Sequence, residues 1–324
     1  MRLILGLLSV LPFPVQHMGS GDSVQPRDTV SVIDSITPAL PAGVAVDIVG
    51  SDTFVRVQSD GHDVMITGYK NEPYMHITTK GDVFVNDGSQ TTLINGNRYG
   101  NVDTSSFVES PNPVWRKIGT NGTAMWHDHR VHWMSPKQPA PIDTAGTVLE
   151  WKVSMSVDGV PTTVAGTLFL REKASMLWWL AGFAALLCAV VLSVRRRREF
   201  FVLTFLISMV GVAVGAMQYI GLPDGARITP LILMFSSGAA VVAAVSMFMQ
   251  RRGQASQHIA VSLNAGAGAT LVVCGWLCAD QVRAAYVPGI DQEWLVRMLI
   301  PALLGIGFVA TIDGVTRIMR NTTD

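Results

Sequence analysis

The sequence predicts a chain of two classes: an all-β Ig-like sandwich that is exported, followed by an all-α bundle of five transmembrane helices. Charged residues make up only 15% of the 324 residues. The apolar excess is concentrated after residue 174, where long uncharged runs occur, whereas the preceding residues alternate short β-branched runs with Gly and Pro. We therefore expect a signal-like segment at 1–19, an extracytoplasmic domain at 20–174 and a membrane domain at 175–324.

The N-terminal segment has the features of an export signal. Leu3–Leu11 is a short apolar run behind Arg2, too short to cross a bilayer but suited to the apolar region of a secretory signal peptide. An exported first domain requires such a signal, so we expect residues 1–19 to provide it.

Strand signals extend from residue 44 to residue 170. The alternation of Leu149, Trp151, Val153 and Met155 on one face indicates a half-buried strand, with Trp151 in the core. Asp60-Gly61, Lys80-Gly81, Asn95-Gly96 and Asp158-Gly159 are tight-turn signals of hairpins. Many short strands with closely spaced turns indicate an antiparallel sandwich. The expected strands are Val44–Val49, Thr53–Val57, Asp63–Thr67, Tyr74–Thr78, Asp82–Val85, Leu149–Val157 and Pro161–Leu170.

Five later stretches are long and apolar enough to cross a hydrocarbon core about 30 Å thick. They cover residues 175–194, 200–220, 229–249, 258–279 and 295–317. Arginines follow the first, third and fifth stretches, while the opposite connections have only scattered ones. The positive-inside rule then places the C-terminus in the cytoplasm of a bacterium and the β domain outside its plasma membrane.

The hairpin at 149–170 carries a family resemblance. Its Trp151 strand, the Ser156-Val157-Asp158-Gly159 turn and the following Gly166-to-Phe169 strand resemble the closing hairpin of CopC-type copper-binding domains. The resemblance implies a small periplasmic sandwich. The turn histidine that binds metal in that family would fall at Val160, so this ligand is missing. The whole arrangement also resembles membrane proteins of actinobacteria, which implies no defined activity.

Residues 125–134, Met-Trp-His-Asp-His-Arg-Val-His-Trp-Met, hold three of the seven histidines. As a strand, the segment would point His127 and His129 to one face, and His132 to the other unless a turn at Arg130-Val131 redirects it. Imidazole is the commonest metal ligand in proteins, and a thioether adds a soft donor for copper.

These residue types predict a metal site, with copper as the expected ion and zinc as the alternative. Asp128 would serve as a ligand or as an orienting partner, and Met134 as the soft donor. His76 would be a remote ligand, with His62 a weaker candidate. The candidate metal residues are His127, Asp128, His129, His132, Met134 and His76.

A structural network is the competing interpretation of the same segment. Asp128 would then bond Arg130 or a histidine, with Trp126 and Trp133 as core anchors. Catalysis is not expected: a triad of Ser105, His127 and Asp128 can be written, but the sequence has no nucleophile elbow of the Gly-x-Ser-x-Gly type.

Few ionisable groups fall inside the expected spans. Asp313 and Arg317 have the spacing of an ion pair on one helix face, which favours bundle packing over transport. Cys274 and Cys278 share a face of the fourth span. They could serve helix packing or pass a soft metal ion inward, and the sequence leaves both roles open. A net charge of zero gives no basic field for nucleic acid.

Two functions remain open from the sequence. One is a membrane-anchored extracytoplasmic protein that binds an ion, most simply copper, and delivers or sequesters it. The other is a non-catalytic accessory or assembly subunit of an envelope or respiratory membrane complex, with the Trp-rich segment as a docking surface. Both require the lipid bilayer and a membrane-protein partner.

Overall fold

The computed structural model describes residues 25, 27–97, 102–108, 110, 112–135, 137–252 and 257–321. The predicted signal-like segment 1–19 lies outside these residues. The chain divides into two compact units, one containing Ser31–Phe169 and the other containing Leu170–Leu222 and Arg227–Asp324.

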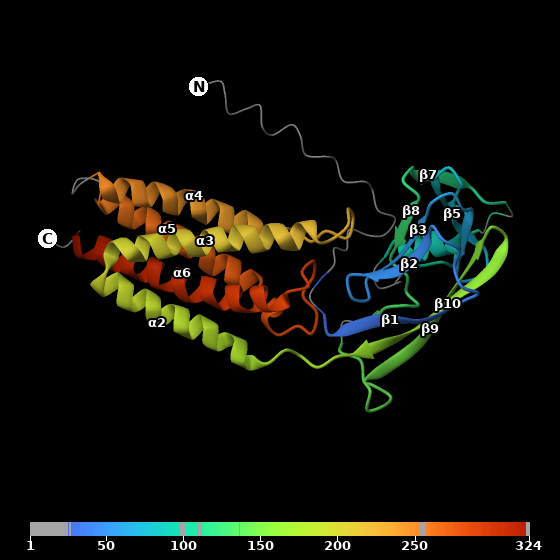
Figure 1. Ribbon diagram of the computed structural model, residues 1–324, viewed down its shortest axis with the longest axis horizontal. Helices are drawn as coiled ribbons and strands as arrows, with labels where there is room; N and C mark the ends of the chain where they lie inside the picture. The colour runs from blue at the N-terminus through green and yellow to red at the C-terminus, as the bar shows by residue number, and fades with distance from the viewer. Residues whose placement is uncertain are drawn as a thin grey trace, which may run out of the picture. The chain divides into compact units, whose positions relative to one another are not determined.

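The first unit is a β-sandwich, as predicted, with ten strands in the described residues (Figure 1). Neighbouring strands from β10 to β7 in the large sheet, and all strands of the small sheet, pair in antiparallel fashion. The large sheet has the order β1 (Thr29–Thr37), β10 (Val160–Leu170), β9 (Thr147–Val157), β4 (Val64–Thr67), β5 (Pro73–Ile77), β6 (Val83–Asn86) and β7 (Trp115–Gly119). The small sheet has the order β2 (Val44–Val49), β3 (Phe54–Ser59) and β8 (Thr123–Trp126).

One hydrophobic core is formed from residues of both sheets. In β9, Trp151, Val153 and Met155 are buried while the residues between them are exposed, as the alternation predicts. Trp151 is 4% exposed, so its predicted core position is confirmed. Val55 and Val57 of the small sheet are part of the same cluster.

Two features of this unit differ from the prediction. β1, β7 and β8 were not expected as strands. Asn95-Gly96 is not a hairpin turn, because it ends the short helix α1 (Gln90–Asn95). Ser89 starts this helix by accepting a hydrogen bond from the Thr91 N–H, and the Gly96 N–H bonds the Thr92 carbonyl at its end.

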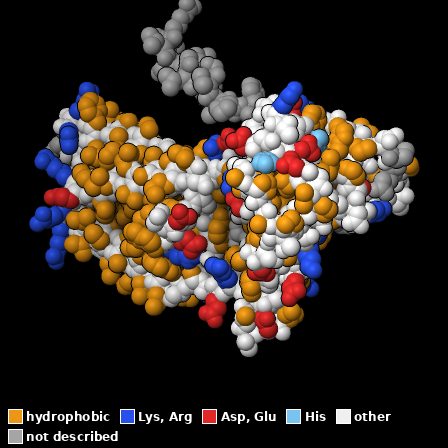
Figure 2. All heavy atoms as spheres, turned by 45° about the vertical axis from the view of Figure 1, so that its right-hand side comes forward, with side chains coloured by type: hydrophobic (Ala, Val, Ile, Leu, Met, Phe, Trp, Pro, Cys, Tyr) orange, Lys and Arg blue, Asp and Glu red, His pale blue; other side chains and the backbone are white. Residues whose placement is uncertain are grey.

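The second unit contains the five predicted apolar helices, each long enough to cross a membrane. Their exposed faces are largely apolar in Figure 2, which indicates contact with lipid. A short 3₁₀ turn, η1 (Met176–Trp178), leads into the first helix. The helices are α2 (Trp179–Arg195), α3 (Arg197–Ile220), α4 (Leu231–Arg251), α5 (Gln257–Leu277) and α6 (Glu293–Asn321).

Small residues let the helix backbones approach closely around α6, which packs against α2 and α5. A Cβ atom added to Gly182 of α2 would lie 2.7 Å from the Pro301 carbonyl oxygen of α6. The predicted ion pair is present, with Arg317 Nε 2.7 Å from Asp313 Oδ1. These contacts agree with a packed bundle.

Candidate metal centre

The histidine segment leaves the small sheet as a turn, not as a continued strand. β8 pairs with β3 as far as Trp126, which lies opposite Val55. Beyond it, Asp128 Oδ1 accepts the backbone N–H of Arg130 at 3.0 Å, and the Asp128 carbonyl accepts the Val131 N–H at 3.1 Å. This is the local bonding by which an aspartate competes with a strand. The turn carries His132 back toward His127.

Asp128 is engaged in an internal network, so its predicted role as a metal ligand is not supported. Its carboxylate is fully buried and accepts bonds from Arg130 Nε at 2.9 Å, Arg130 Nη2 at 2.6 Å and the Trp126 indole at 2.8 Å. Burial opposes ionisation, but Arg130 and Trp126 outweigh it and hold the pKa of Asp128 below its ordinary value. The structural network and the histidine cluster therefore coexist, and the Asp128 carboxylate belongs to the network.

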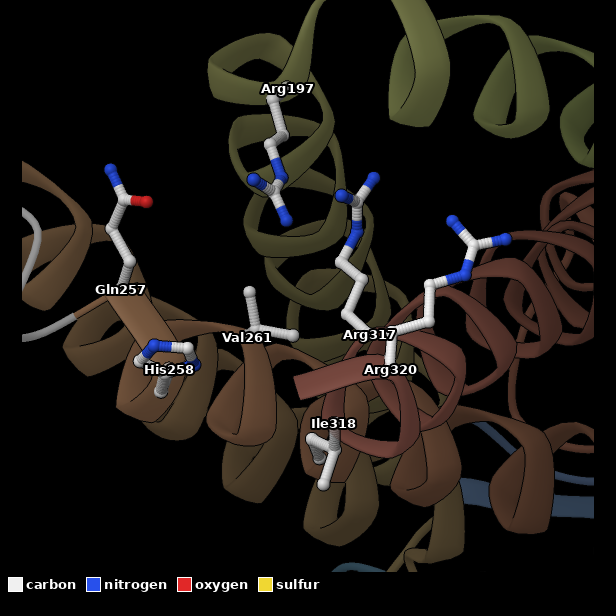
Figure 3. A pocket seen from close by; sticks show the side chains of 7 residues that line it. All are labelled: Arg197, Gln257, His258, Val261, Arg317, Ile318 and Arg320. Atoms are coloured by element: carbon white, nitrogen blue, oxygen red, sulfur yellow. The ribbon is translucent and has the colours of Figure 1, made fainter. Parts of the chain in front are cut away.

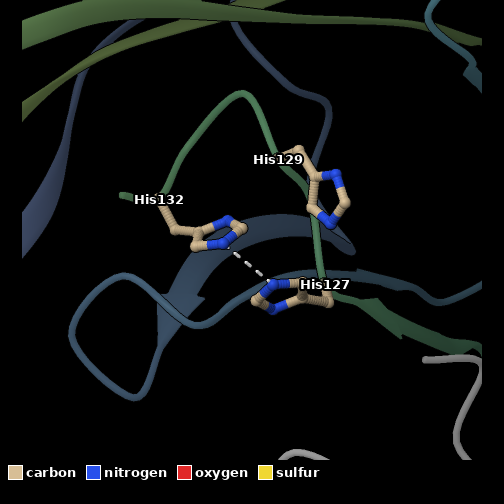
Figure 4. A group of neighbouring side chains, drawn as sticks. All are labelled: His127, His129 and His132. Carbon is tan, nitrogen blue, oxygen red and sulfur yellow. Dashed lines mark hydrogen bonds between the residues drawn. The ribbon is translucent and has the colours of Figure 1, made fainter. Parts of the chain in front are cut away.

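Three histidines converge at this turn, as Figure 4 shows. One ring nitrogen from each of His127, His129 and His132 lies within 4.8 Å of the others. The ring centroids of His127 and His132 are 4.0 Å apart, and each is 5.3 Å from the centroid of His129. His127 and His132 are 2% and 1% exposed, whereas His129 is partly exposed. The described geometry can hold a metal ion, with His129 on its more open side.

Backbone groups orient all three rings. His127 Nδ1 lies 2.7 Å from the Thr53 carbonyl oxygen, and His132 Nδ1 lies 3.2 Å from that of Asp128. His129 bonds the backbone of Asn97. Because a carbonyl oxygen can only accept, each Nδ1 of His127 and His132 carries the hydrogen, and their Nε2 atoms face inward at a separation of 3.0 Å.

His129 supplies the third inward nitrogen. Its Nε2 is buried and has no hydrogen-bond partner in the described structure, so the bond to Asn97 uses Nδ1. Burial lowers the pKa of His129, against the opposing effects of the Asn97 backbone and the Asp128 charge. The ring is therefore neutral at pH 7, with its Nε2 lone pair available to a ligand.

Tyr69 supports His129 from outside the triad. Burial raises the pKa of Tyr69, so its hydroxyl stays protonated at neutral pH. The same oxygen accepts the His129 N–H at 2.9 Å, and the two rings stack with their centroids 6.3 Å apart. The Arg130 guanidinium lies 4.9 Å from the centre of the Tyr69 ring. Tyr69 thus contacts two residues of the turn, His129 and Arg130.

The other predicted site residues are placed elsewhere or are not tested. His76 Nε2 bonds Asp63 Oδ2 at 2.7 Å and its ring packs beside Trp115, and this histidine is not one of the three that converge at the turn. His62 is likewise bonded to Asp158, at 2.7 Å. Met134 is partly buried two residues beyond His132, and its role as a soft donor stays a prediction.

The sequence did not indicate Thr53, Asn97 or Tyr69 as parts of the site. Thr53 and Asn97 act through their backbones, which have no side-chain signature. Tyr69 lies 60 residues before His129 and meets it only through the fold.

Comparison with known proteins does not assign the chain to a family. No protein-family model, no curated protein and no solved structure matches the chain.

Proposed function

We propose that the β-sandwich unit binds one metal ion through the Nε2 atoms of His127, His129 and His132. The observation that carries the proposal is the pair of inward nitrogens 3.0 Å apart on His127 and His132. Both Nδ1 atoms donate to carbonyls, so in two neutral rings the Nε2 lone pairs would face each other and repel. A bound cation between them turns this repulsion into coordination.

The spacing suits a tetrahedral ion. Metal–nitrogen bonds of about 2.0–2.1 Å at tetrahedral angles put neighbouring donor atoms about 3.3 Å apart. The His127–His132 separation differs from this by a few tenths of an ångström, and His129 lies within reach on the open side. Three imidazoles leave a fourth position for water, for a partner's donor or for a sulfur atom such as that of Met134.

Copper is the ion we propose first, and zinc is the alternative. Three nitrogen donors without a thiolate suit Cu²⁺ and Zn²⁺, and divalent copper binds such sites more tightly than zinc. The membrane helices would anchor this domain at the outer face of a bacterial plasma membrane, where it would deliver the ion to a membrane partner or sequester it. The resemblance of the 149–170 hairpin to CopC-type domains supports the sandwich and its place outside the plasma membrane more than the choice of metal.

Burial of tryptophan in the histidine segment counts against the alternative of a metal-free accessory subunit. The Trp-rich segment was the expected docking surface, but its Trp126 side chain is fully buried in the sandwich core. Trp133 is partly buried and donates its indole N–H to the Lys137 carbonyl at 2.6 Å. A docking surface at this segment would have to be made by other residues.

Metal analysis of the full-length protein tests the proposal. The protein is purified in detergent, stripped with a chelator and titrated with Cu²⁺ in air, Cu⁺ under anaerobic conditions and Zn²⁺. We expect one ion per chain. His129→Ala removes the partly exposed donor. Loss of a group that only orients a metal ligand already lowers affinity roughly 10–100-fold, so loss of a ligand itself should lower it at least as much.

His76→Ala is the matched control, because this histidine belongs to the same unit but bonds the Asp63 carboxylate and lies outside the triad. It should bind metal as the wild type does. Wild-type protein that retains none of the three ions would refute the proposal, as would a His129→Ala variant with unchanged affinity. Preference for Zn²⁺ over both copper ions would keep the site but replace the ion.

A further inference from the structure

A second cluster of side chains lies at the arginine-rich end of the helical unit. Helices α2 and α4 end there, α3 and α5 begin there, and α6 ends there. Lys and Arg spheres gather on this end in Figure 2. In the described part of the chain it has eight arginines against two acids, Glu199 and Asp313. The arginines are Arg195, Arg196, Arg197, Arg198, Arg251, Arg252, Arg317 and Arg320.

Three of these arginines line a cavity of about 260 Å³ between α3, α5 and α6 (Figure 3). Its remaining lining residues are Gln257, His258, Val261 and Ile318. The volume is several times the roughly 30 Å³ that a water molecule occupies in the liquid. A small tetrahedral anion therefore has room in it.

The guanidinium groups of Arg197 and Arg317 point toward each other across this cavity in Figure 3, with that of Arg320 beside them. Arg197 Nε is buried and has no hydrogen-bond partner in the described structure. Arg317 uses its Nε for Asp313, so one carboxylate offsets one of the positive charges at this cavity. Like charges held this close repel each other unless an anion lies between them.

The N-terminus of helix α5 adds a partial positive charge that favours an anion in the cavity. Gln257 and His258 are the first two residues of α5, so the positive end of a 21-residue helix faces the cavity. Guanidinium groups bind phosphate oxygens in pairs of parallel hydrogen bonds. Basic pockets between transmembrane helices at the cytoplasmic side are where acidic headgroups bind.

We propose that this cavity binds a phosphate group, with Arg197, Arg317 and Arg320 as its cationic partners. The two sources of that chemistry are the headgroup of an acidic phospholipid and a free phosphate. The site is independent of the histidine triad, because all its residues belong to the helical unit.

Binding to the delipidated full-length protein in neutral detergent tests the proposal. The probes are phosphatidylglycerol, phosphatidylcholine and inorganic phosphate, added separately. Wild-type protein should bind phosphatidylglycerol or inorganic phosphate, and Arg197→Gln should weaken that binding about tenfold or more through loss of a charge-assisted contact. Arg198→Gln removes the same charge from an exposed neighbour outside the cavity, and should change the affinity less than about twofold.

The pattern of probes identifies the source. Binding of phosphatidylglycerol but neither of the other two assigns a lipid headgroup, whereas binding of inorganic phosphate that also displaces the lipid assigns a free phosphate. Equal losses in Arg197→Gln and Arg198→Gln would reduce the effect to general surface charge and overturn the proposal, as would equal binding of the two lipids without any binding of phosphate. If Arg197→Gln does not yield folded protein, Arg320→Gln replaces it as the test variant. The expected loss of binding is again about tenfold or more, and Arg198→Gln remains the control.

Discussion

Removal of the Asp128 carboxylate is expected to destabilise the sandwich unit strongly. This carboxylate is fully buried and accepts hydrogen bonds from Arg130 and from the Trp126 indole. In Asp128→Ala the Arg130 side chain, 22% exposed, keeps its charge but loses its anionic partner. Breaking one side of a buried ion pair costs about 3–5 kcal/mol, and a stranded indole N–H adds about 1–3 kcal/mol.

The lower end of this range is already measurable. For a unit of this size about 3 kcal/mol corresponds to a fall of at least roughly 6 °C in melting temperature. Thermal unfolding of the full-length protein in detergent, followed by tryptophan fluorescence, measures it. Since Asp128 also forms the turn between His127 and His132, the variant should bind metal more weakly than wild type.

Asp47→Ala is the matched control. Asp47 pairs with Arg56 on the same sandwich, but its side chain is 46% exposed, and such pairs contribute about 0–1 kcal/mol. It should therefore change the melting temperature little. If Asp128→Ala melted within about 2 °C of wild type, the buried network would not stabilise the turn, and the orienting role given to Asp128 would be wrong.

Three further outcomes follow from the structure. Trp151→Ala should cost about 3–5 kcal/mol of unfolding free energy, because it empties a core site; a chemical denaturation curve close to wild type would contradict this. His62 should titrate by NMR with a pKa above its ordinary value of about 6.5 and return toward that value in Asp158→Asn, because Asp158 accepts its Nδ1–H. The His62 contribution to stability is therefore present below about pH 6.5 and lost as pH rises through the raised pKa; a folded-state pKa at or below 6.5 would reverse this sign. Reporter fusions after Arg198 should read cytoplasmic and those near Asp291 external, and the opposite result would invert the proposed topology.

The membrane helices and most strands could be predicted because their signals are local. A bilayer requires about 20 consecutive apolar residues whatever surrounds them, so all five spans agree with the structure to within a few residues. β2 was predicted with its observed bounds, Val44–Val49, and Trp151 was placed correctly in the core. Alternation along a strand directly encodes which side faces the interior.

The failures arose where two local signals compete. Asn95-Gly96 is typical of a hairpin turn, yet the N-cap at Ser89 starts a helix that the same glycine ends. At the histidine segment, alternation favoured a strand, but the Asp128 side chain bonds the backbone two residues on and reverses the chain. The Arg130-Val131 pair is compatible with such a turn, but the sequence does not decide between the turn and a continued strand. The distant carbonyl of Thr53 could not be predicted at all.

The three proposed donors belong to one six-residue segment, residues 127–132. Under the proposed function this makes the ligand set a short chelating peptide that retains its donors when the sandwich unfolds. Affinity for the unfolded chain subtracts from the stabilisation that a metal gives the folded one, so the rise in melting temperature will understate the strength of binding. What folding adds is the alignment of the rings by the backbone at Thr53 and Asn97. Under this proposal the chain can acquire its ion and its fold in either order.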